Sequence, residues 1–202
     1  FAMFVQIFEG NTDDPQAVRD RVERWEREVR PGAIGYLGST GGVTDDGRVV
    51  MLARFTDRAA AEANSARPEQ SAWWAEVEQC FTGPVTFHET DDITEMRHGD
   101  AQQARFVQVM EGHVTDRVRA ERLQDKMEPL LSSMRPDLLG TTTAYFDDGA
   151  YASLAYFSDE QEARRNEQAS VPDAVAGQLA EWDRLLPVEE YIDLTRPVLI
   201  RA

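Results

Sequence analysis

The sequence predicts an α+β fold in which one folding unit occurs twice. The heptapeptide Phe4–Gly10 returns as Phe106–Gly112, with five identities over a register shift of 102 residues. The turn sequence Asp-Asp-Gly also recurs, at 45–47 and at 147–149. Each heptapeptide is a β-type run that ends in glycine and precedes a helix-like segment. The chain therefore contains an internal duplication, and each copy begins a folding unit.

Within the first unit, the elements follow the order strand, helix, strand, strand, helix, strand. The first strand is apolar on both faces apart from Gln6. The first helix carries one apolar stripe, and the next two strands flank a turn, as in a β-hairpin. The second helical region is interrupted at Pro68. We expect strands at 3–9, 33–40, 48–55 and 85–90, with helical regions at 15–30 and 57–81.

This order is the split βαββαβ pattern of ferredoxin-like folds, and the second half of the chain repeats it. Residues 91–104 are polar and lack periodicity. We therefore predict one ferredoxin-like repeat over 1–93, a linker over 94–104 and a second repeat over 105–202.

Composition excludes several classes of partner. Lys and Arg total 21 against 37 Asp and Glu, which gives a net charge of −16. Nucleic acid and anionic membranes need a basic face, so neither is expected. Cys80 is the only cysteine and can form neither an internal disulfide nor a thiolate metal site. With no secretory leader and no run of ~18 apolar residues, we expect a soluble cytoplasmic protein.

The element order, the Phe-x-Gln first strand and the segment 55–64 resemble the antibiotic-biosynthesis monooxygenase-like family of the dimeric α+β barrel superfamily. Residues 63–74 resemble, more narrowly, tandem actinobacterial proteins of about this length. The resemblance implies that the two sheets form a barrel-like pseudo-dimer within one chain. The first strand of each repeat is apolar on both faces, which agrees with a partner sheet. Whether two chains pair again stays open.

The resemblance also implies a function. Some members of the family oxidise polyketide-like aromatic rings in the barrel without a metal or flavin, so no cofactor is expected. That chemistry needs an apolar cavity, a hydrogen-bond donor and a base, because the deprotonated substrate supplies the electrons. The alternative is a non-catalytic protein of the same fold that binds a small hydrophobic or aromatic molecule, or another protein.

Four amides are candidate ligand contacts. Gln6 and Gln108 lie between large apolar residues on strands expected to face the barrel, where an amide needs a hydrogen-bond partner. Either amide could orient a ligand or tie its strand to a neighbour. Asn64 and Asn166 lie where family members often carry a ligand-contacting residue, although an asparagine also ends helices.

Trp73 and Trp74 could supply a stacking wall. Alignment of the repeats matches Trp74 with Leu179 in a shared core stripe, and Trp73 with Gln178, so Trp73 need not belong to the core. Haem-degrading members of the superfamily use a histidine on this helix. Residues 71–81 contain none, so haem is not expected.

Three further side chains are candidates for the site. His88 is the one histidine on a predicted strand and could act as a base in the barrel, or could be structural. Arg54 and Tyr156 occupy equivalent positions and could orient an acidic or phenolic ligand, although an arginine there is usually at the surface. An enzyme should have a pocket lined by Gln6 or Gln108, an aromatic wall and a titratable group.

Overall fold

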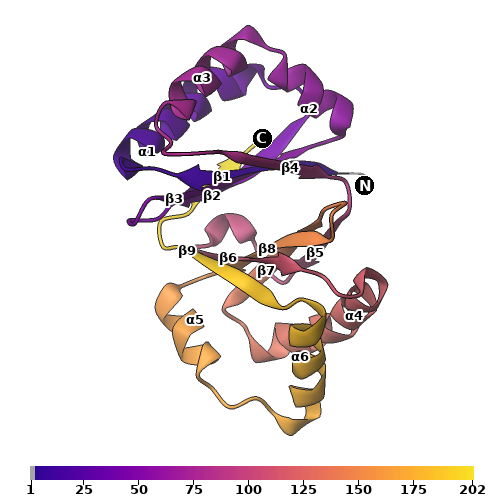
Figure 1. Cartoon of the computed structure of the whole chain (residues 1–202). Coiled ribbons are helices and arrows are strands. Elements are labelled where there is room, and N and C mark those ends of the chain that lie inside the picture. Colours follow the sequence, from indigo (N-terminus) through magenta and orange to yellow (C-terminus); the bar gives the residue numbers. More distant parts are fainter. Residues whose placement is uncertain (1–2) are drawn as a thin grey trace. The chain divides into compact units, whose positions relative to one another are not determined.

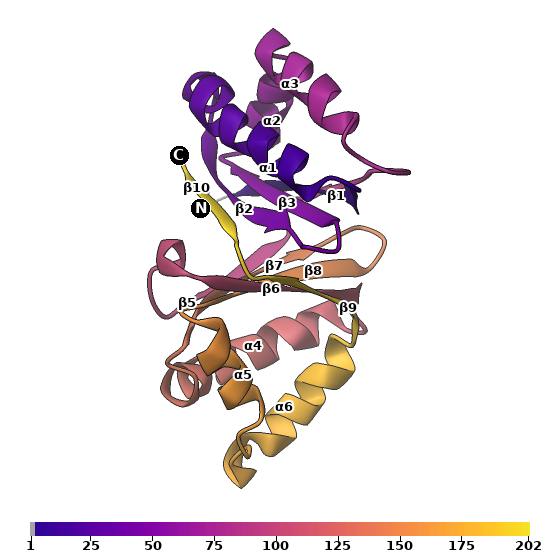
Figure 2. The ribbon, with the colours of Figure 1, turned by 90° about the vertical axis from the view of Figure 1, so that its left-hand side faces the viewer.

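The computed structural model describes residues 3–202, and each repeat forms an α+β unit (Figure 1). Unit 1 runs to Asp91 and resumes at Arg196, whereas unit 2 is Asp92–Thr195. In each unit the helices cover one face of a five-stranded antiparallel sheet (Figure 2). The predicted tandem α+β architecture is confirmed.

Unit 1 has its strands in the order β10-β2-β3-β1-β4. A π-helical turn and a short 3₁₀ turn follow its first helix. The elements are β1 (Phe4–Asn11), α1 (Pro15–Arg24), the π-helical turn (Trp25–Val29), the 3₁₀ turn (Arg30–Gly32), β2 (Tyr36–Val43), β3 (Arg48–Phe55), α2 (Arg58–Ser65), α3 (Pro68–Glu78), β4 (Thr86–Thr90) and β10 (Val198–Arg201).

Unit 2 repeats this arrangement with the order β5-β7-β8-β6-β9. One continuous α-helix takes the place of α1 and its π-helical turn. The elements are β5 (Ile93–Arg97), a 3₁₀ turn (Ala101–Gln103), β6 (Phe106–His113), α4 (Arg117–Met134), β7 (Leu138–Tyr145), β8 (Ala150–Phe157), α5 (Glu160–Glu167), α6 (Asp173–Leu185) and β9 (Val188–Leu194).

Local sequence explains where these elements begin and turn. An aspartate caps the first helix and the second helix of each unit, and its carboxylate accepts a backbone N–H of the first turn. Pro68 opens α3, where its missing N–H costs nothing. Gly47 and Gly149 turn the two hairpins at φ of +91° and +84°, a region that favours glycine.

The end strands correct the expected domain boundaries. Residues 94–104 were predicted to be a linker, yet β5 lies there and pairs with β7 of unit 2. The tail strand β10 pairs with β2 of unit 1. The edge of each sheet is thus completed by the segment that follows the last strand of the other repeat. These short strands lie outside the strand–helix–strand–strand–helix–strand order, so the order gave no reason to expect them.

Glycines make room for both end strands. A Cβ on Gly38 would lie 2.7 Å from the carbonyl oxygen of Ile200, and one on Gly140 would lie 2.5 Å from that of Met96. Both glycines follow an irregularity in strand register, one in β2 and one in β7. The duplication therefore includes the pairing of the end strands.

The apolar stripe predicted for the first helix packs into the core of unit 1 together with the tail strand. Val18, Val22, Trp25 and Val29 are buried in one cluster with Ile200. Within residues 3–202, no helix has both the length and the apolar character needed to span a membrane.

Shortening Ile200 should destabilise unit 1, because this side chain is 2% exposed and its removal leaves a hole in the core. We expect Ile200→Ala to lower the free energy of unfolding by about 2–4 kcal/mol and Ile200→Val by about 1 kcal/mol. Urea denaturation followed by tryptophan fluorescence in a Trp182→Phe background reports unit 1, which holds the other tryptophans. An unchanged midpoint for Ile200→Ala would show that β10 does not contribute to the core.

Candidate functional site

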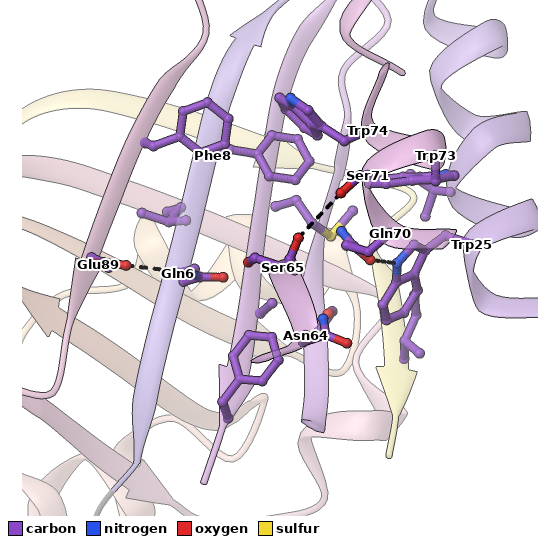
Figure 3. Close-up of a pocket in the computed structure, with 18 of the residues that line it drawn as sticks. Gln6, Phe8, Trp25, Asn64, Ser65, Gln70, Ser71, Trp73, Trp74 and Glu89 are labelled. Carbon is purple, nitrogen blue, oxygen red and sulfur yellow. Dashed lines mark hydrogen bonds between the residues drawn. The ribbon is translucent and has the colours of Figure 1, made fainter. Parts of the chain in front are cut away.

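A cavity of about 570 Å³ lies in unit 1 between the helices and the sheet (Figure 3). Its size is in the range of small-molecule sites. All of its lining residues belong to unit 1. They are Gln6, Ile7, Phe8, Val22, Trp25, Ser39, Met51, Ala53, Phe55, Asn64, Ser65, Gln70, Ser71, Trp73, Trp74, Phe87, His88, Glu89 and Ile200.

One row of side chains forms the floor of the cavity. Strand register places Ser39, Ala53, Gln6 and Glu89 side by side across β2, β3, β1 and β4. Side chains opposite one another in neighbouring strands share a face, and this face lies under the helices. Gln6 was expected to face a barrel between two sheets, so the structure corrects its position. The alternation of β1 sends Val5 and Ile7 to the other face.

Gln6 is held by a carboxylate on the edge strand. Its Nε2 donates to Oε2 of Glu89 at 3.3 Å, and Arg58 donates to Oε1 of the same carboxylate at 2.6 Å. The amide oxygen of Gln6 therefore points away from Glu89, toward the cavity (Figure 3). Because Arg58 and Glu89 are about half exposed, this ion pair adds little stability. The ion pair instead holds the Glu89 carboxylate in place, and this carboxylate orients the Gln6 amide.

Aromatic rings form one wall. The Trp74 ring lies edge-on to Phe8 and to Phe87, with centroids 5.1 Å apart in both pairs. Such edge-to-face pairs add stability beyond their buried area. Phe87 is 60% exposed and so forms the rim of the cavity. This wall comes from β1, α3 and β4.

Of the two adjacent tryptophans, Trp73 is the more deeply buried, although the alignment of the repeats matched Trp74 with the core stripe. Trp73 is buried at 6% exposure, and its Nε1 donates to the backbone oxygen of Arg21 at 2.7 Å. Trp74 is partly buried and contributes to the aromatic wall. The reason is helical spacing: Trp73 precedes the buried Val77 by four residues and so shares its face. The comparison of repeats gave no reason to expect Trp73 in the core.

Polar groups are also present in the roof. Asn64 of α2 is buried, and its Oδ1 accepts a hydrogen bond from Arg67 at 3.0 Å, which leaves the amide N–H groups as donors. Gln70 accepts a hydrogen bond from Nε1 of Trp25 at 2.7 Å. Asn64 and both tryptophans predicted for the site thus join Gln6 around one cavity (Figure 3).

A hydroxyl pair lies at the β2 end of the floor. The Tyr36 hydroxyl donates to Oγ of Ser39 at 2.6 Å, and both residues are buried. Burial raises the pKa of Tyr36 to about 12, because the phenolate would lose its hydration, although the bond to Ser39 opposes this shift. Tyr36 therefore stays neutral at physiological pH.

Two other predicted residues lie on the opposite face of the sheet. His88 pairs with Ile7 and Arg54 pairs with Val5, so both side chains leave the sheet away from Gln6. His88 remains among the lining residues because β4 forms an edge of the cavity. Glu89 is the carboxylate that flanks Gln6. Sequence reasoning missed it, although the alternation of β4 gives His88 and Glu89 opposite directions.

Unit 2 keeps the polar tie without the aromatic wall. Gln108 donates to Asp193 at 2.9 Å, and Arg164 donates to the same carboxylate at 2.5 Å. The Tyr191 ring is 60% exposed, and Met110 replaces the ring of Phe8. In this unit Gln108 is 9% exposed, and its amide ties β6 to β9.

The other predicted residues of unit 2 have structural contacts. Asn166 hydrogen-bonds Asp137, and this bond, together with Arg135, lowers the pKa of the Asp137 carboxyl against the opposing effect of burial. Tyr156 pairs with Val107 and so lies on the face away from the helices. Within residues 3–202, no cluster of three or more His, Cys, Asp or Glu side chains could hold a metal ion.

Comparisons with known proteins match the fold. No protein-family model and no curated protein sequence matches the chain. A protein of Lactobacillus acidophilus NCFM, provisionally described as a monooxygenase, superposes with a TM-score of 0.70 at 12% identity over 100% of this chain and 97% of that one. A protein of Fusobacterium nucleatum with the same provisional description gives 0.69 at 8% identity, covering 100% and 93%. A protein described as anthrone oxidase-like gives 0.69 at 10% identity, covering 100% and 92%.

These matches span both units, so the chain has the tandem fold of proteins described as monooxygenases. The resemblance predicted from the sequence is confirmed for the fold, as two such units in tandem in one chain. At 8–12% identity the likeness carries no residue roles.

The raised pKa of Tyr36 makes a prediction for alkaline stability. The unfolded tyrosine ionises near its usual pKa of about 10, whereas the folded one stays protonated to about 12. Its contribution is therefore complete below pH 10 and is lost as the pH rises to 12, roughly 2–3 kcal/mol in all. Urea unfolding at stepped pH should show this loss in the wild type, and Tyr36→Phe should lack that part of it. Equal alkaline slopes for the two proteins would contradict the assignment.

Proposed function

We propose that unit 1 binds a planar fused-ring ketone or phenol of the anthrone type in its cavity and oxidises it with dioxygen, without a metal or flavin. The observation that carries this proposal is the 570 Å³ cavity, which combines an aromatic wall with the oriented amide of Gln6. The monooxygenase-type fold of the structural relatives is consistent with it.

The lining suits a flat, mostly apolar ring system. Phe8, Trp74 and Phe87 offer edges and faces to an aromatic ligand, which favours stacking over binding of a sugar or a phosphate. The amide oxygen of Gln6 accepts a hydrogen bond from a ring hydroxyl, and the Asn64 amide donates one. Few fixed polar groups in an apolar pocket are typical of small-molecule sites.

In the proposed reaction, a ring CH₂ activated by a carbonyl loses a proton to the carboxylate of Glu89. The resulting carbanion reduces dioxygen, and a new C–O bond gives a hydroperoxide. Loss of water then leaves a second ring carbonyl, so one CH₂ and one O₂ become one C=O and one H₂O. The protein supplies an apolar cavity, orientation and a proton acceptor.

A second candidate function is binding without turnover. Both oxygens of Glu89 already accept hydrogen bonds, from Gln6 and from Arg58. A carboxylate engaged in this way orients its partners whether or not it accepts a proton. Saturable binding of anthrone without consumption of dioxygen above the uncatalysed rate would support this function over oxidation.

Replacing Gln6, or its counterpart Gln108, shows which of the two units binds the ligand. We expect Gln6→Leu to weaken binding of 4-hydroxyanthrone, whose hydroxyl lies beside the CH₂, about tenfold, because the hydrogen bond from this hydroxyl to the Gln6 amide oxygen is lost. The matched change Gln108→Leu should leave binding unchanged, since Gln108 ties two strands of unit 2. Anaerobic titration with quenching of tryptophan fluorescence measures both constants. Equal effects of the two changes would contradict a ligand site in unit 1.

Filling the cavity should block the ligand and spare the fold. Ala53 lies in the floor between Ser39 and Gln6, so a phenylalanine there occupies the space of a bound ring. We expect Ala53→Phe to abolish anthrone binding and dioxygen consumption, with thermal unfolding shifted by a few degrees at most. A variant that still consumes dioxygen at the wild-type rate would place the reaction elsewhere.

A further inference from the structure

The hydroxyl pair of Tyr36 and Ser39 takes no part in the chemistry described so far. Ser39 lines the cavity and is 4% exposed, while Tyr36 is 7% exposed in the adjoining core. The Tyr36 hydroxyl donates to Oγ of Ser39 at 2.6 Å. An oxygen that already accepts this bond keeps its own proton available as a donor. At 4% exposure this hydroxyl has lost most of its hydration, so a ligand oxygen can take the place of water as its acceptor.

Ser39 lies at the opposite end of the cavity floor from Glu89. Ser39 and Gln6 lie in one row across β2, β3 and β1, with Ala53 between them. Two strand spacings separate the backbones of Ser39 and Gln6 by roughly 10 Å. A ring standing over Ala53 can therefore meet the Ser39 hydroxyl at one edge and the Gln6–Glu89 pair at the other.

We propose that the Ser39 hydroxyl, positioned by Tyr36, binds the carbonyl oxygen of the ligand and stabilises the negative charge that forms there on deprotonation. This inference rests on the proposed function and names the orientation of its substrate. The carbonyl points toward β2, and the acidic CH₂ on the opposite edge of the ring points toward Gln6 and Glu89. The ligand class is thus a cyclic aryl ketone with a CH₂ across the ring from its carbonyl.

The proton and electron balance of this step is simple. The C–H bond breaks, its proton moves to Glu89, and its electron pair delocalises through the ring onto the carbonyl oxygen. That oxygen becomes an enolate, to which a hydrogen bond is stronger than to the neutral ketone. A donor aimed at the site of developing charge lowers the barrier without having to reorganise.

Unit 2 has no tyrosine–serine pair at the corresponding positions. Leu138 stands at the position of Tyr36, and Thr141 at that of Ser39, as their pairing with Phe157 and Ala155 shows. The leucine cannot donate, so the arrangement occurs in the unit that has the aromatic cavity. Thr141 provides a matched control.

The test uses the full chain, without dioxygen, and two probes that differ in the carbonyl. Anthrone carries the carbonyl, and dihydroanthracene has a CH₂ in its place. We expect Ser39→Ala to weaken anthrone binding about tenfold and to leave dihydroanthracene binding unchanged. Ser39→Thr keeps the hydroxyl and should retain anthrone binding. Thr141→Ala should affect neither probe.

A second readout separates positioning from packing. Ionisation of bound anthrone changes its absorption spectrum, and we expect Ser39→Ala to raise the pH midpoint of this change by about one unit. Tyr36→Phe should raise it by a smaller amount. Unchanged midpoints, or equal loss of both probes, would overturn the inference and leave the proposed function standing. If wild-type protein fails to bind anthrone, the proposed function fails, and this inference fails with it.

Discussion

Two buried indole N–H groups hold the helical layer of unit 1 together. A buried donor must find an acceptor, and here both acceptors lie in the helical layer itself. Trp73 of α3 donates to the backbone of α1, and Trp25, at the start of the π-helical turn, donates to Gln70 of α3. Each bond therefore ties one helix to the other. These two hydrogen bonds hold the helices together as the roof of the cavity, whose floor contains the small side chain of Ala53.

The repeats show which features occur in both units and which occur in unit 1 alone. In both units a glutamine of the first strand (β1 or β6) donates to a carboxylate of the neighbouring edge strand (β4 or β9). An arginine donates to the same carboxylate. The two arginines come from different turns of the second helix, Arg58 at its start and Arg164 one turn later. A contact made from different positions indicates that both units require it, and in unit 1 it also directs the Gln6 amide oxygen into the cavity. The aromatic wall and the Tyr36–Ser39 pair distinguish unit 1.

Much of the fold could be predicted from the sequence because its signals are local. The repeated heptapeptide, the aspartate caps and the glycine turns each specify an element. The end strands β5 and β10 could not be predicted, since they lie outside the repeated six-element order, whereas β4, as short as β5, was expected because it completes that order. For Trp73 and Trp74, comparison of the repeats was misleading. Helical spacing from Val77 would have identified Trp73 as the buried residue.

The candidate site was predicted less completely, because the sequence of a strand does not show which of its two faces the helices cover. Gln6, Asn64 and the tryptophans do surround one cavity, yet that cavity lies under the helices of unit 1. Apolar residues on both faces of β1 gave no sign of which face Gln6 would take. His88 and Glu89 are adjacent on β4, and only the register with β1 decides which of them lies beside Gln6.

The most direct test is a crystal structure of the protein with anthrone bound in the absence of dioxygen. Our account predicts density for one ring system in unit 1, between Ala53 and Trp74, with its carbonyl toward Ser39 and its opposite edge toward Gln6. Density for the ligand at any other place, with the unit 1 cavity empty at saturating anthrone, would contradict it.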